Sequence, residues 1–358
     1  MNEHETPARS ESGTGGESSS SSLPENVLLR VRSLKKYFPV ARRRGEPGVT
    51  VRAVDDVSFD VVEGKTLSLV GESGCGKTTT ARCIIRAIQP TSGDIYFRTE
   101  ANELLNLSKL KRNELRPIRN EMQLIFQDPY SSLNPRMSVH DIVAEPLVIQ
   151  GSKDREAINE RVCRLLELVG LSPKHRTRFP NAFSGGQRQR IGIARAIALN
   201  PRLLIADEAV SALDVSVQAQ IINLLLKLQK DFNLTYIFVT HDLSVVKHIS
   251  HQVAVMYIGR VVELSDCAAI FEKPLHPYTA VLLASVPKLD PMSRGRRTVP
   301  QGEAPSPRNP PSGCYFHPRC AYAEDRCRTT APSWVEVQPK RFVRCHRAKE
   351  LDLPGVGR

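Results

Sequence analysis

Residues 71–80, Gly-Glu-Ser-Gly-Cys-Gly-Lys-Thr-Thr-Thr, place glycines, a lysine and hydroxyls at a spacing that suits a polyphosphate. The glycines allow a tight turn in which successive backbone N–H groups point at one anion. Lys77 can then reach the β- and γ-phosphate oxygens, and the Thr78 hydroxyl can bind magnesium. The nucleotide-binding residues predicted in this loop are Gly71, Ser73, Gly74, Cys75, Gly76, Lys77, Thr78 and Thr79, with Cys75 acting as a small residue.

An acidic pair, Asp207 and Glu208, follows the apolar run 203–206. A carboxylate at the tip of a strand beside a phosphate loop can hold magnesium, and this role is predicted for Asp207. Glu208, one residue further on, is then placed to polarise the attacking water. An ordinary solvated turn would have the same composition, but the phosphate loop elsewhere in the chain favours the catalytic interpretation.

A third polar segment, Ser184-Gly185-Gly186-Gln187, precedes a helix-like stretch over residues 191–198. Serine and glycines at a helix start expose backbone amides and a hydroxyl, which together can bind an anion. Taken alone, the segment fits a simple helix cap equally well.

Short apolar strands must position these polar segments. The strands predicted from the sequence cover residues 67–70, 123–126, 203–206, 236–239 and 253–257. Each is followed by a polar or glycine-rich turn, and helix-like segments separate them. This alternation predicts an α/β fold with a largely parallel sheet, whose ligands bind at the carboxyl ends of the strands.

The composition, 41% apolar and 25% charged over 358 residues, is that of a globular protein. Because no run of 18 apolar residues exists, we expect no helix that crosses a bilayer. The polar, acidic residues 1–11 lack the features of a secretory signal, so we expect the chain to stay in the cytosol. The Ser/Gly-rich segment 1–26 is predicted to be disordered. A net charge of +12 is compatible with nucleic-acid or anionic-membrane partners.

Four of the eight cysteines fall near the C-terminus, at Cys314, Cys320, Cys327 and Cys345. Four thiolates suit zinc or an iron–sulfur cluster. The gaps of five and six residues between the first three are longer than those of most zinc knuckles, which disfavours zinc. His317 and His346 keep a mixed Cys/His zinc site open, and plain free thiols are the third alternative.

With Phe183 before it, the Ser-Gly-Gly-Gln segment resembles the signature motif of the ATP-binding subunits of ABC transporters, and the likeness extends over residues 28–325. The resemblance implies a P-loop ABC ATPase core with a parallel sheet, an antiparallel β subdomain and a helical subdomain. It also implies further roles for single residues. These are Gln127 at magnesium and the lytic water, Asp214 in the loop that reaches across a dimer interface, His241 at the γ-phosphate, and Tyr37 (or Phe38) stacked on adenine. Ala209 departs from the family, which usually has proline there.

In the family, the signature residues Ser184, Gly185, Gly186 and Gln187 contact a nucleotide held by the other subunit. One chain therefore carries half of each of two ATP sites, and ATP joins two chains.

Residues 126–137 and 276–287 resemble the oligopeptide/dipeptide importers, specifically their second ATPase subunit. The resemblance implies a sister ATPase in a heterodimer, two transmembrane permease subunits, an external solute-binding protein, and a peripheral place on the cytoplasmic face of the bacterial membrane. Nickel and glutathione are alternative cargoes within the group. The four C-terminal cysteines resemble those that hold a 4Fe–4S cluster in such ATPases.

The resulting domain prediction is a tail at 1–26, a nucleotide-binding domain at 27–272 with a helical subdomain at 131–183, and a loop-rich extension at 273–358. The helical subdomain is expected to dock the membrane subunits. The competing classes are a nucleic-acid-handling ABC ATPase, suggested by the net charge, and an adaptor with a vestigial site. A nucleic-acid-handling ATPase usually carries paired cassettes or long coiled-coil insertions, and this sequence has neither, so no nucleic-acid partner is expected. A vestigial site would lack Lys77 or Glu208, and both are present.

Overall fold

The computed structural model describes residues 23–40, 50–128, 130–285 and 302–356. An eight-stranded sheet forms the centre, in the order β11-β12-β10-β9-β3-β8-β7-β6. Its strands are β3 (Thr66–Val70), β6 (Met122–Ile125), β7 (Leu203–Asp207), β8 (Thr235–Thr240), β9 (Gln252–Tyr257), β10 (Arg260–Asp266), β11 (Val335–Gln338) and β12 (Arg341–Val343). The five strands from β9 to β6 run parallel, which confirms all five predicted strands to within one residue at each end.

A second, antiparallel sheet lies beside the first, in the order β2-β1-β4-β5. It consists of β1 (Val27–Pro39), β2 (Thr50–Val62), β4 (Ser92–Arg98) and β5 (Leu104–Asn106), and it matches the predicted β subdomain. One apolar cluster fills the space between the sheets and includes Leu29, Phe59 and Ile205. Both faces of the parallel strands are buried because helices and the second sheet cover them, which explains why these strands read as continuous apolar runs.

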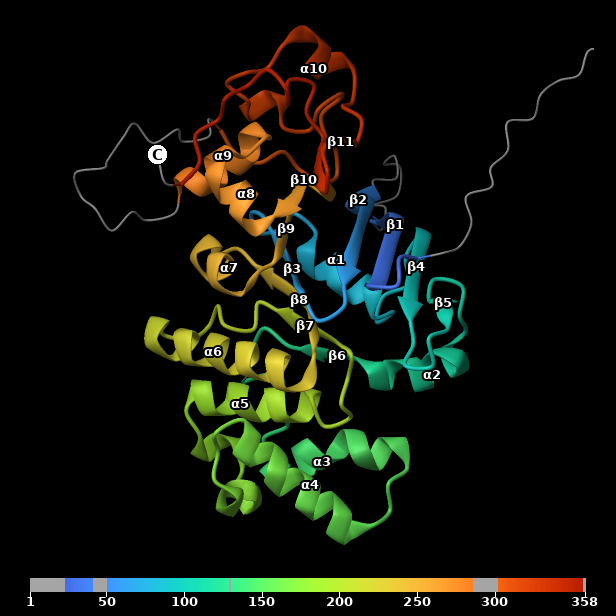
Figure 1. Cartoon of the computed structure of the whole chain (residues 1–358), viewed down its shortest axis with the longest axis vertical. Helices are drawn as coiled ribbons and strands as arrows, with labels where there is room; N and C mark the ends of the chain where they lie inside the picture. The colour runs from blue at the N-terminus through green and yellow to red at the C-terminus, as the bar shows by residue number, and fades with distance from the viewer. Residues whose placement is uncertain (1–22, 41–49, 129, 286–301, 357–358) are drawn as a thin grey trace, which may run out of the picture.

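The helices of the core are α1 (Lys77–Ile84), α2 (Arg112–Glu121), α5 (Gly185–Ala196), α6 (Val215–Phe232), α7 (Leu243–Ile249) and α8 (Cys267–Glu272). The predicted helical subdomain holds α3 (Val139–Gln150) and α4 (Arg155–Leu168), followed by the 3-10 turns η1 (Pro173–Thr177) and η2 (Pro180–Ala182). Ser138 and Asp154 cap α3 and α4, so the sequence specifies where both helices begin. The subdomain and the C-terminal extension occupy opposite ends of the long axis (Figure 1).

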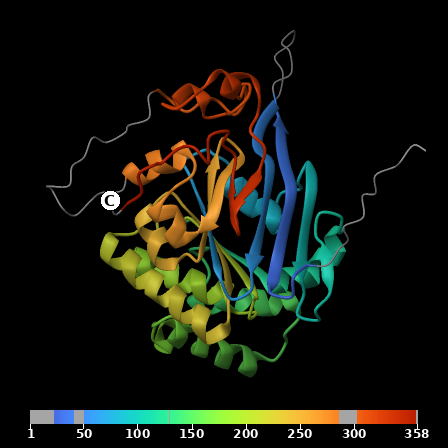
Figure 2. The ribbon, with the colours of Figure 1, turned by 45° about the horizontal axis from the view of Figure 1, so that its top comes forward.

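The C-terminal extension contains α9 (Pro277–Ala284), η4 (His317–Arg319) and α10 (Asp325–Thr329), and its two strands β11 and β12 join the central sheet through β10. It is therefore packed on the core rather than tethered beside it. Figure 2 shows the red segment lying over the end of the fold that carries the orange strands. Most of the residues linking α9 to η4, 286–301, lie outside the described residues.

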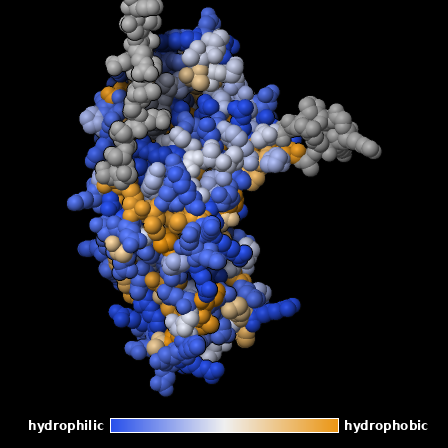
Figure 3. Space-filling view, turned by 90° about the vertical axis from the view of Figure 1, so that its right-hand side faces the viewer, coloured by the Kyte–Doolittle hydropathy of each residue, from blue (hydrophilic) through white to orange (hydrophobic). Residues whose placement is uncertain are grey.

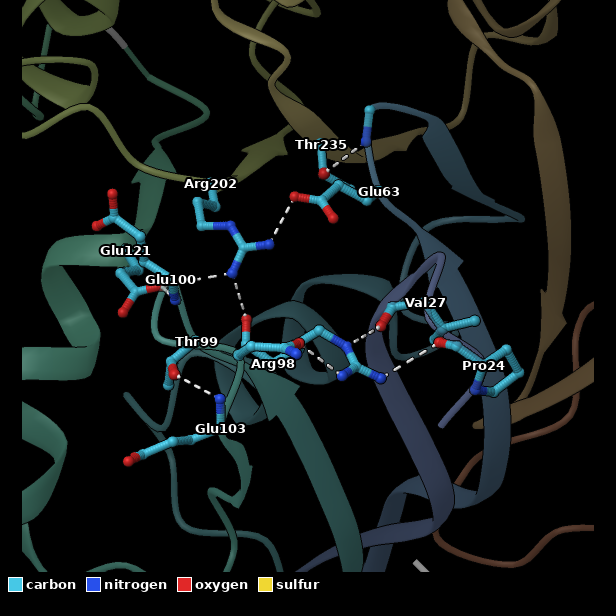
Figure 4. A network of polar contacts seen from close by, with 12 residues as sticks. Pro24, Val27, Glu63, Arg98, Thr99, Glu100, Glu103, Glu121, Arg202 and Thr235 are labelled. Carbon is cyan, nitrogen blue, oxygen red and sulfur yellow. Dashed lines mark hydrogen bonds and ion pairs between the residues drawn. The ribbon is translucent and has the colours of Figure 1, made fainter. Parts of the chain in front are cut away.

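The N-terminal boundary differs from the prediction. Residues 1–22 lie outside the described residues, but 23–26 are ordered against β4. Leu23 is buried, and Arg98 donates hydrogen bonds to the carbonyl oxygens of Leu23 and Pro24 at 3.1 and 3.3 Å (Figure 4). Disorder was expected through residue 26 because the segment is polar. The one apolar side chain at its end and a long-range arginine contact hold these four residues in place.

Candidate nucleotide site

The loop between β3 and α1 depends on glycine at two positions. Gly71 has φ +151°, and a Cβ there would lie 2.2 Å from the carbonyl oxygen of Met256. Gly76 is the N-cap of α1 with φ +106°, and a Cβ there would lie 2.1 Å from the carbonyl oxygen of Ala53. Both approaches are closer than any side chain tolerates, so the tight turn predicted from the sequence requires these two glycines.

Lys77 is buried beneath the loop it serves. Its Nζ donates to the carbonyl oxygens of Gly71 and Glu72 at 2.8 and 2.9 Å, and lies 3.7 Å from the Sγ of Cys75. Burial raises the pKa of the Cys75 thiol, against the lowering effect of the Lys77 charge. Cys75 was predicted to act only as a small residue, but its sulfur also packs against the lysine. The predicted binding of phosphate by Lys77 would require these contacts to be exchanged for phosphate oxygens.

The two predicted magnesium ligands meet across the sheet. Thr78 Oγ1 donates to Asp207 Oδ1 at 2.8 Å, and Asp207 is buried at the tip of β7. Burial raises the pKa of Asp207, while the hydrogen bond from Thr78 lowers it. Because magnesium is bound by carboxylate and hydroxyl oxygens, this oxygen pair fits the ion that the sequence predicts.

Three predicted catalytic side chains also come together. Gln127 Nε2 donates to Glu208 Oε2 at 2.7 Å, and His241 Nδ1 lies 3.6 Å from Glu208 Oε1. The register of the sheet causes this convergence, because Asp207 pairs with Val239 in the parallel strands β7 and β8. Gln127 contacts Glu208 in this structure, and its predicted role at magnesium remains a prediction.

Glu208 has a left-handed backbone with φ +48°, which is unfavourable for a residue other than glycine. Its N–H donates to the carbonyl oxygen of Val239 at 2.9 Å, which holds it in that conformation. Strain of this kind gathers at functional sites, and here it turns the carboxylate toward Gln127 and His241.

The signature segment forms a capping box at the start of α5. Ser184 Oγ accepts from the Gln187 N–H at 3.4 Å, and Gln187 Oε1 accepts from the Ser184 N–H at 3.1 Å. Gly186 is buried, and a Cβ there would lie 2.4 Å from Val217 Cγ1. Asp214 is the N-cap of α6 and is exposed. Within the described residues no hydrogen bond joins this segment to the phosphate loop, so its predicted contact with a partner's nucleotide remains a prediction.

Tyr37, predicted to stack on adenine, is held by a carboxylate. Its hydroxyl donates to Asp55 Oδ1 at 2.5 Å, and the guanidinium of Arg52 lies 5.9 Å from its ring centre. Burial and the Asp55 hydrogen bond raise the pKa of Tyr37 to about 12. Phe38, the alternative, is 37% exposed with Lys36 over its ring. Sequence reasoning missed Asp55, which follows no motif and becomes visible only when β1 and β2 pair.

The four C-terminal cysteines line one pocket together with His276, His317 and His346. Burial, with a smaller contribution from the neighbouring thiols, raises the pKa of Cys314 to about 11 and that of Cys345 to about 12. The two histidines that left a mixed Cys/His zinc site open each place one ring nitrogen beside a backbone carbonyl oxygen, His317 at Cys314 and His346 at Thr330. Over the described ranges, no three His, Cys, Asp or Glu side chains form a group able to hold a metal ion.

Two known families match this chain. Residues 54–211 match the family described as ABC transporter, and residues 262–327 match the oligopeptide/dipeptide transporter C-terminal region. A probable peptide ABC transporter ATP-binding protein of Sinorhizobium fredii is 54% identical over 323 residues, which cover 90% of each chain. The chain belongs to the oligopeptide/dipeptide family of ABC transporter ATP-binding proteins. An oligopeptide transport ATP-binding protein of Bacillus subtilis is 49% identical, with 90% of this chain and 98% of that protein covered.

Among solved structures, this ABC ATPase is similar to the dimeric ATP-binding cassette MJ0796 bound to ADP and phosphate. The TM-score is 0.58 at 28% identity, over 67% of this chain and 99% of that one. The unmatched third of the chain leaves room for an extension beyond the common cassette. The likeness confirms the P-loop ABC fold. Together with the family match, it shows that the chain is an ATP-hydrolysing enzyme. No helix in the described part of the chain is both long and apolar enough to span a membrane.

Proposed function

We propose that this ATPase powers the import of di- and oligopeptides through a membrane complex. The observation that carries the proposal is the match of residues 262–327 to a region particular to oligopeptide/dipeptide transporters, together with relatives named for peptide transport. The cassette alone is compatible with any ABC transporter, whereas the match of the extension favours an oligopeptide/dipeptide transporter.

The chemistry follows from the side chains that converge at the phosphate loop. Lys77 binds the β- and γ-phosphates, and Thr78 with Asp207 would hold magnesium, which supplies positive charge that neutralises the transferring phosphoryl group. Glu208 accepts a proton from the attacking water, while Gln127 and His241 orient that water and the γ-phosphate from either side of the carboxylate. Positioning and charge stabilisation supply most of the rate enhancement.

The site is completed by a second subunit. The exposed hydroxyl of Ser184 and the amides of Gly185 and Gly186 stand at the start of α5, apart from the chain's own phosphate loop. A sister ATPase in a heterodimer would supply the missing half of each site, with Asp214 at the interface. Membrane association then comes from two permease subunits, which place the ATPase on the cytoplasmic face, and an external solute-binding protein delivers the peptide.

A groove between α2, β6, α3 and α5, with a volume of about 1330 Å³, suits the docking of a permease loop. Apolar side chains of Phe126 and Ile149, 46% and 62% exposed, line it beside Arg112 and Arg116. Figure 3 faces the side of the molecule that carries α2 and α3, where apolar side chains gather among charged ones. Phe126 also precedes Gln127 directly, so a docked helix would press on the catalytic glutamine.

Replacing Ile149 with aspartate tests the docking role. We expect retention of the ATPase in detergent-solubilised permeases to fall at least tenfold, because a charge cannot be desolvated in an apolar contact. Tyr322→Ala, at an exposed aromatic on the extension, is the matched control and should bind normally. Equal retention of both variants would refute the docking surface.

The cargo is tested by growth. A strain that lacks this chain should fail to grow when an essential amino acid is supplied only as a di- or tripeptide. The parent chain should restore growth, and Glu208→Gln should not. If deletion instead abolishes nickel or glutathione uptake and leaves peptide uptake intact, the peptide assignment fails while the transporter assignment stands. Salt-sensitive binding to DNA or ribosomes without membrane association would favour the nucleic-acid alternative.

We further propose that Cys314, Cys320, Cys327 and Cys345 ligate a 4Fe–4S cluster. The support is that all four thiols line one partly apolar pocket. A single zinc ion needs its donors about 2.3 Å from one point, whereas a cluster bridges thiolates that lie farther apart. When bound, the group would supply covalent cross-links between loops that have few strands to hold them.

Anaerobic purification tests the cluster. Four iron atoms per chain and visible absorption are expected for the parent and for Cys163→Ser, whereas Cys327→Ser should lose both. Stoichiometric zinc, or free thiols without metal, would refute the cluster.

A further inference from the structure

Glu72, the second residue of the phosphate loop, is held from three sides. Its N–H donates to the hydroxyl oxygen of Tyr278 at 2.9 Å, and its carbonyl oxygen accepts from Lys77. Its carboxylate accepts from Arg319 Nη1, at 3.2 Å to one oxygen and 3.1 Å to the other. Two of the three partners, Tyr278 and Arg319, belong to the C-terminal extension. The extension therefore contacts both the backbone and the charge of this loop.

The environment of Arg319 favours its ion pair with Glu72, because the arginine side chain is only 7% exposed and its guanidinium lies over the ring of Tyr257. Glu72 is its one ion-pair partner among the described residues. An unpaired Glu72 carboxylate would place a negative charge within the loop that is predicted to bind the negatively charged polyphosphate. Arg319 neutralises that carboxylate, and the burial of the arginine limits how far solvent screens the pair.

A second contact from the extension reaches the predicted adenine side of the site. The hydroxyl of Tyr315 donates to Asp55 Oδ2 at 2.8 Å, and the same carboxylate accepts from Tyr37 at 2.5 Å. Arg260 completes this group, with its Nε 2.9 Å from Asp55 Oδ2 and its guanidinium 4.0 Å from the ring centre of Tyr315. Tyr315 thus fixes the carboxylate that fixes Tyr37.

Both contacts come from one short segment, residues 314–320, which begins and ends at cysteines of the pocket described above. Phe316, between Tyr315 and Arg319, is buried and packs against the rings of Tyr257 and Tyr278 at centroid distances of 5.3 and 5.4 Å. This aromatic packing makes the segment a rigid connection between the cysteine pocket and the two ends of the predicted nucleotide site.

We propose that Arg319 and Tyr315 are positioning residues for the nucleotide, so that the extension is a working part of the ATP site. Arg319 holds and neutralises Glu72 at the phosphate end, and Tyr315 orients Tyr37 through Asp55 at the base end. The proposal rests on the assignment of residues 71–79 and Tyr37 to ATP.

Removing the charge of Arg319 tests its proposed role at the phosphate end of the site. Arg319→Gln should raise the KM for MgATP about tenfold with little change in kcat at saturation, because an unpaired Glu72 repels the bound phosphates in every state. Adding Glu72→Gln to that variant should restore the parental KM within about twofold. Arg319→Lys should restore it in part. Arg326→Gln, which removes exposed ion pairs in the same extension, is the matched control and should leave the KM unchanged.

Inorganic tripolyphosphate distinguishes the phosphate end of the site from the adenine end, because it contains phosphates but no adenine. Its binding, measured by displacement of a fluorescent nucleotide, should weaken in Arg319→Gln and stay parental in Tyr315→Phe. The latter variant should weaken only nucleotide binding, by about threefold.

A parental KM in Arg319→Gln overturns the proposal. The proposal also fails if the double variant, Arg319→Gln with Glu72→Gln, keeps a raised KM for MgATP while unfolding at the parental temperature. If Arg319→Gln does not fold, Glu72→Gln alone decides, since it must bind MgATP at least as tightly as the parent; weaker binding overturns the neutralisation. Loss of nucleotide binding in Lys77→Ala is the separate check on the ATP site, and its absence would refute the site assignment instead.

Discussion

Adding one methyl group at Gly186 should disable the signature helix through packing. A Cβ at this position would lie 2.4 Å from Val217 Cγ1 on α6, whereas carbon atoms in contact prefer about 3.5–4.0 Å. Val217 is β-branched and helical, so it has one strongly preferred rotamer and cannot simply rotate away. The two helices must therefore separate by roughly an ångström at this point.

The size of the effect follows from that overlap. Overpacking of this kind costs about 1–3 kcal/mol of the free energy of unfolding. A displacement of about 1 Å at a catalytic segment can reduce turnover by about 100-fold. Val217→Ala removes the clashing atom, so the double variant should recover at least about 1 kcal/mol relative to Gly186→Ala and regain most of the ATPase activity.

Urea denaturation measures the free energy of unfolding, and steady-state ATPase assays of the assembled complex measure turnover. Gly185→Ala is the matched control, because the nearest atoms to its Cβ would be Leu213 Cδ2 at 3.5 Å and Tyr130 Oη at 3.6 Å, which are ordinary contacts. It should change stability by less than about 0.5 kcal/mol.

A double variant as unstable as Gly186→Ala would show that the contact with Val217 is not the cause of the destabilisation. A double variant that regains stability but not activity would show that Gly186 acts through direct contact with nucleotide rather than through packing.

Three further predictions concern single sites. Glu208→Gln should lower kcat at least about 100-fold while leaving ATP binding intact, because it removes the proton acceptor but keeps the hydrogen bond to Gln127; parental turnover would remove the base assignment. Partial desolvation and then the charge of Lys65 lower the pKa of His251, and its Nδ1 accepts from the Thr66 N–H at 3.1 Å. The unfolded chain takes up a proton near pH 6.5 and the folded chain only at lower pH, so stability present above pH 6.5 is lost on acidification. The urea midpoint should therefore fall less between pH 7 and 5 in His251→Asn than in the parent. Gly192→Ala should raise stability by about 0.5–1 kcal/mol in the same assay, since no described atom beyond its chain neighbours and the adjacent backbone of α5 lies within 4 Å of the added Cβ.

The cassette could be predicted because its information is local. A phosphate loop needs glycine, lysine and threonine at fixed spacing, and parallel strands need short apolar runs, so both can be recognised along the chain. The strand ends were correct to one residue, and the structure brings Thr78 to Asp207 and Gln127 to Glu208, while their roles at magnesium and water remain predictions. Parallel register explains the success, because it brings the carboxyl ends of separate strands to one edge.

The errors arose where long-range contacts outweigh composition. Residues 23–26 read as part of a disordered tail, yet Leu23 is buried and Arg98, some 75 residues away in sequence, holds their carbonyl oxygens.

The family and the ATPase activity were evident from the amino-acid sequence alone, and the residues expected to bind phosphate could be predicted from it, because those side chains follow one another at short, fixed spacings. Only the tertiary structure decided how the extension relates to that chemistry. Arg319 and Glu72 are 247 residues apart, and Tyr315 and Asp55 are 260 apart. No local pattern encodes such pairs, since they exist only after β10 has carried the chain back beside the phosphate loop.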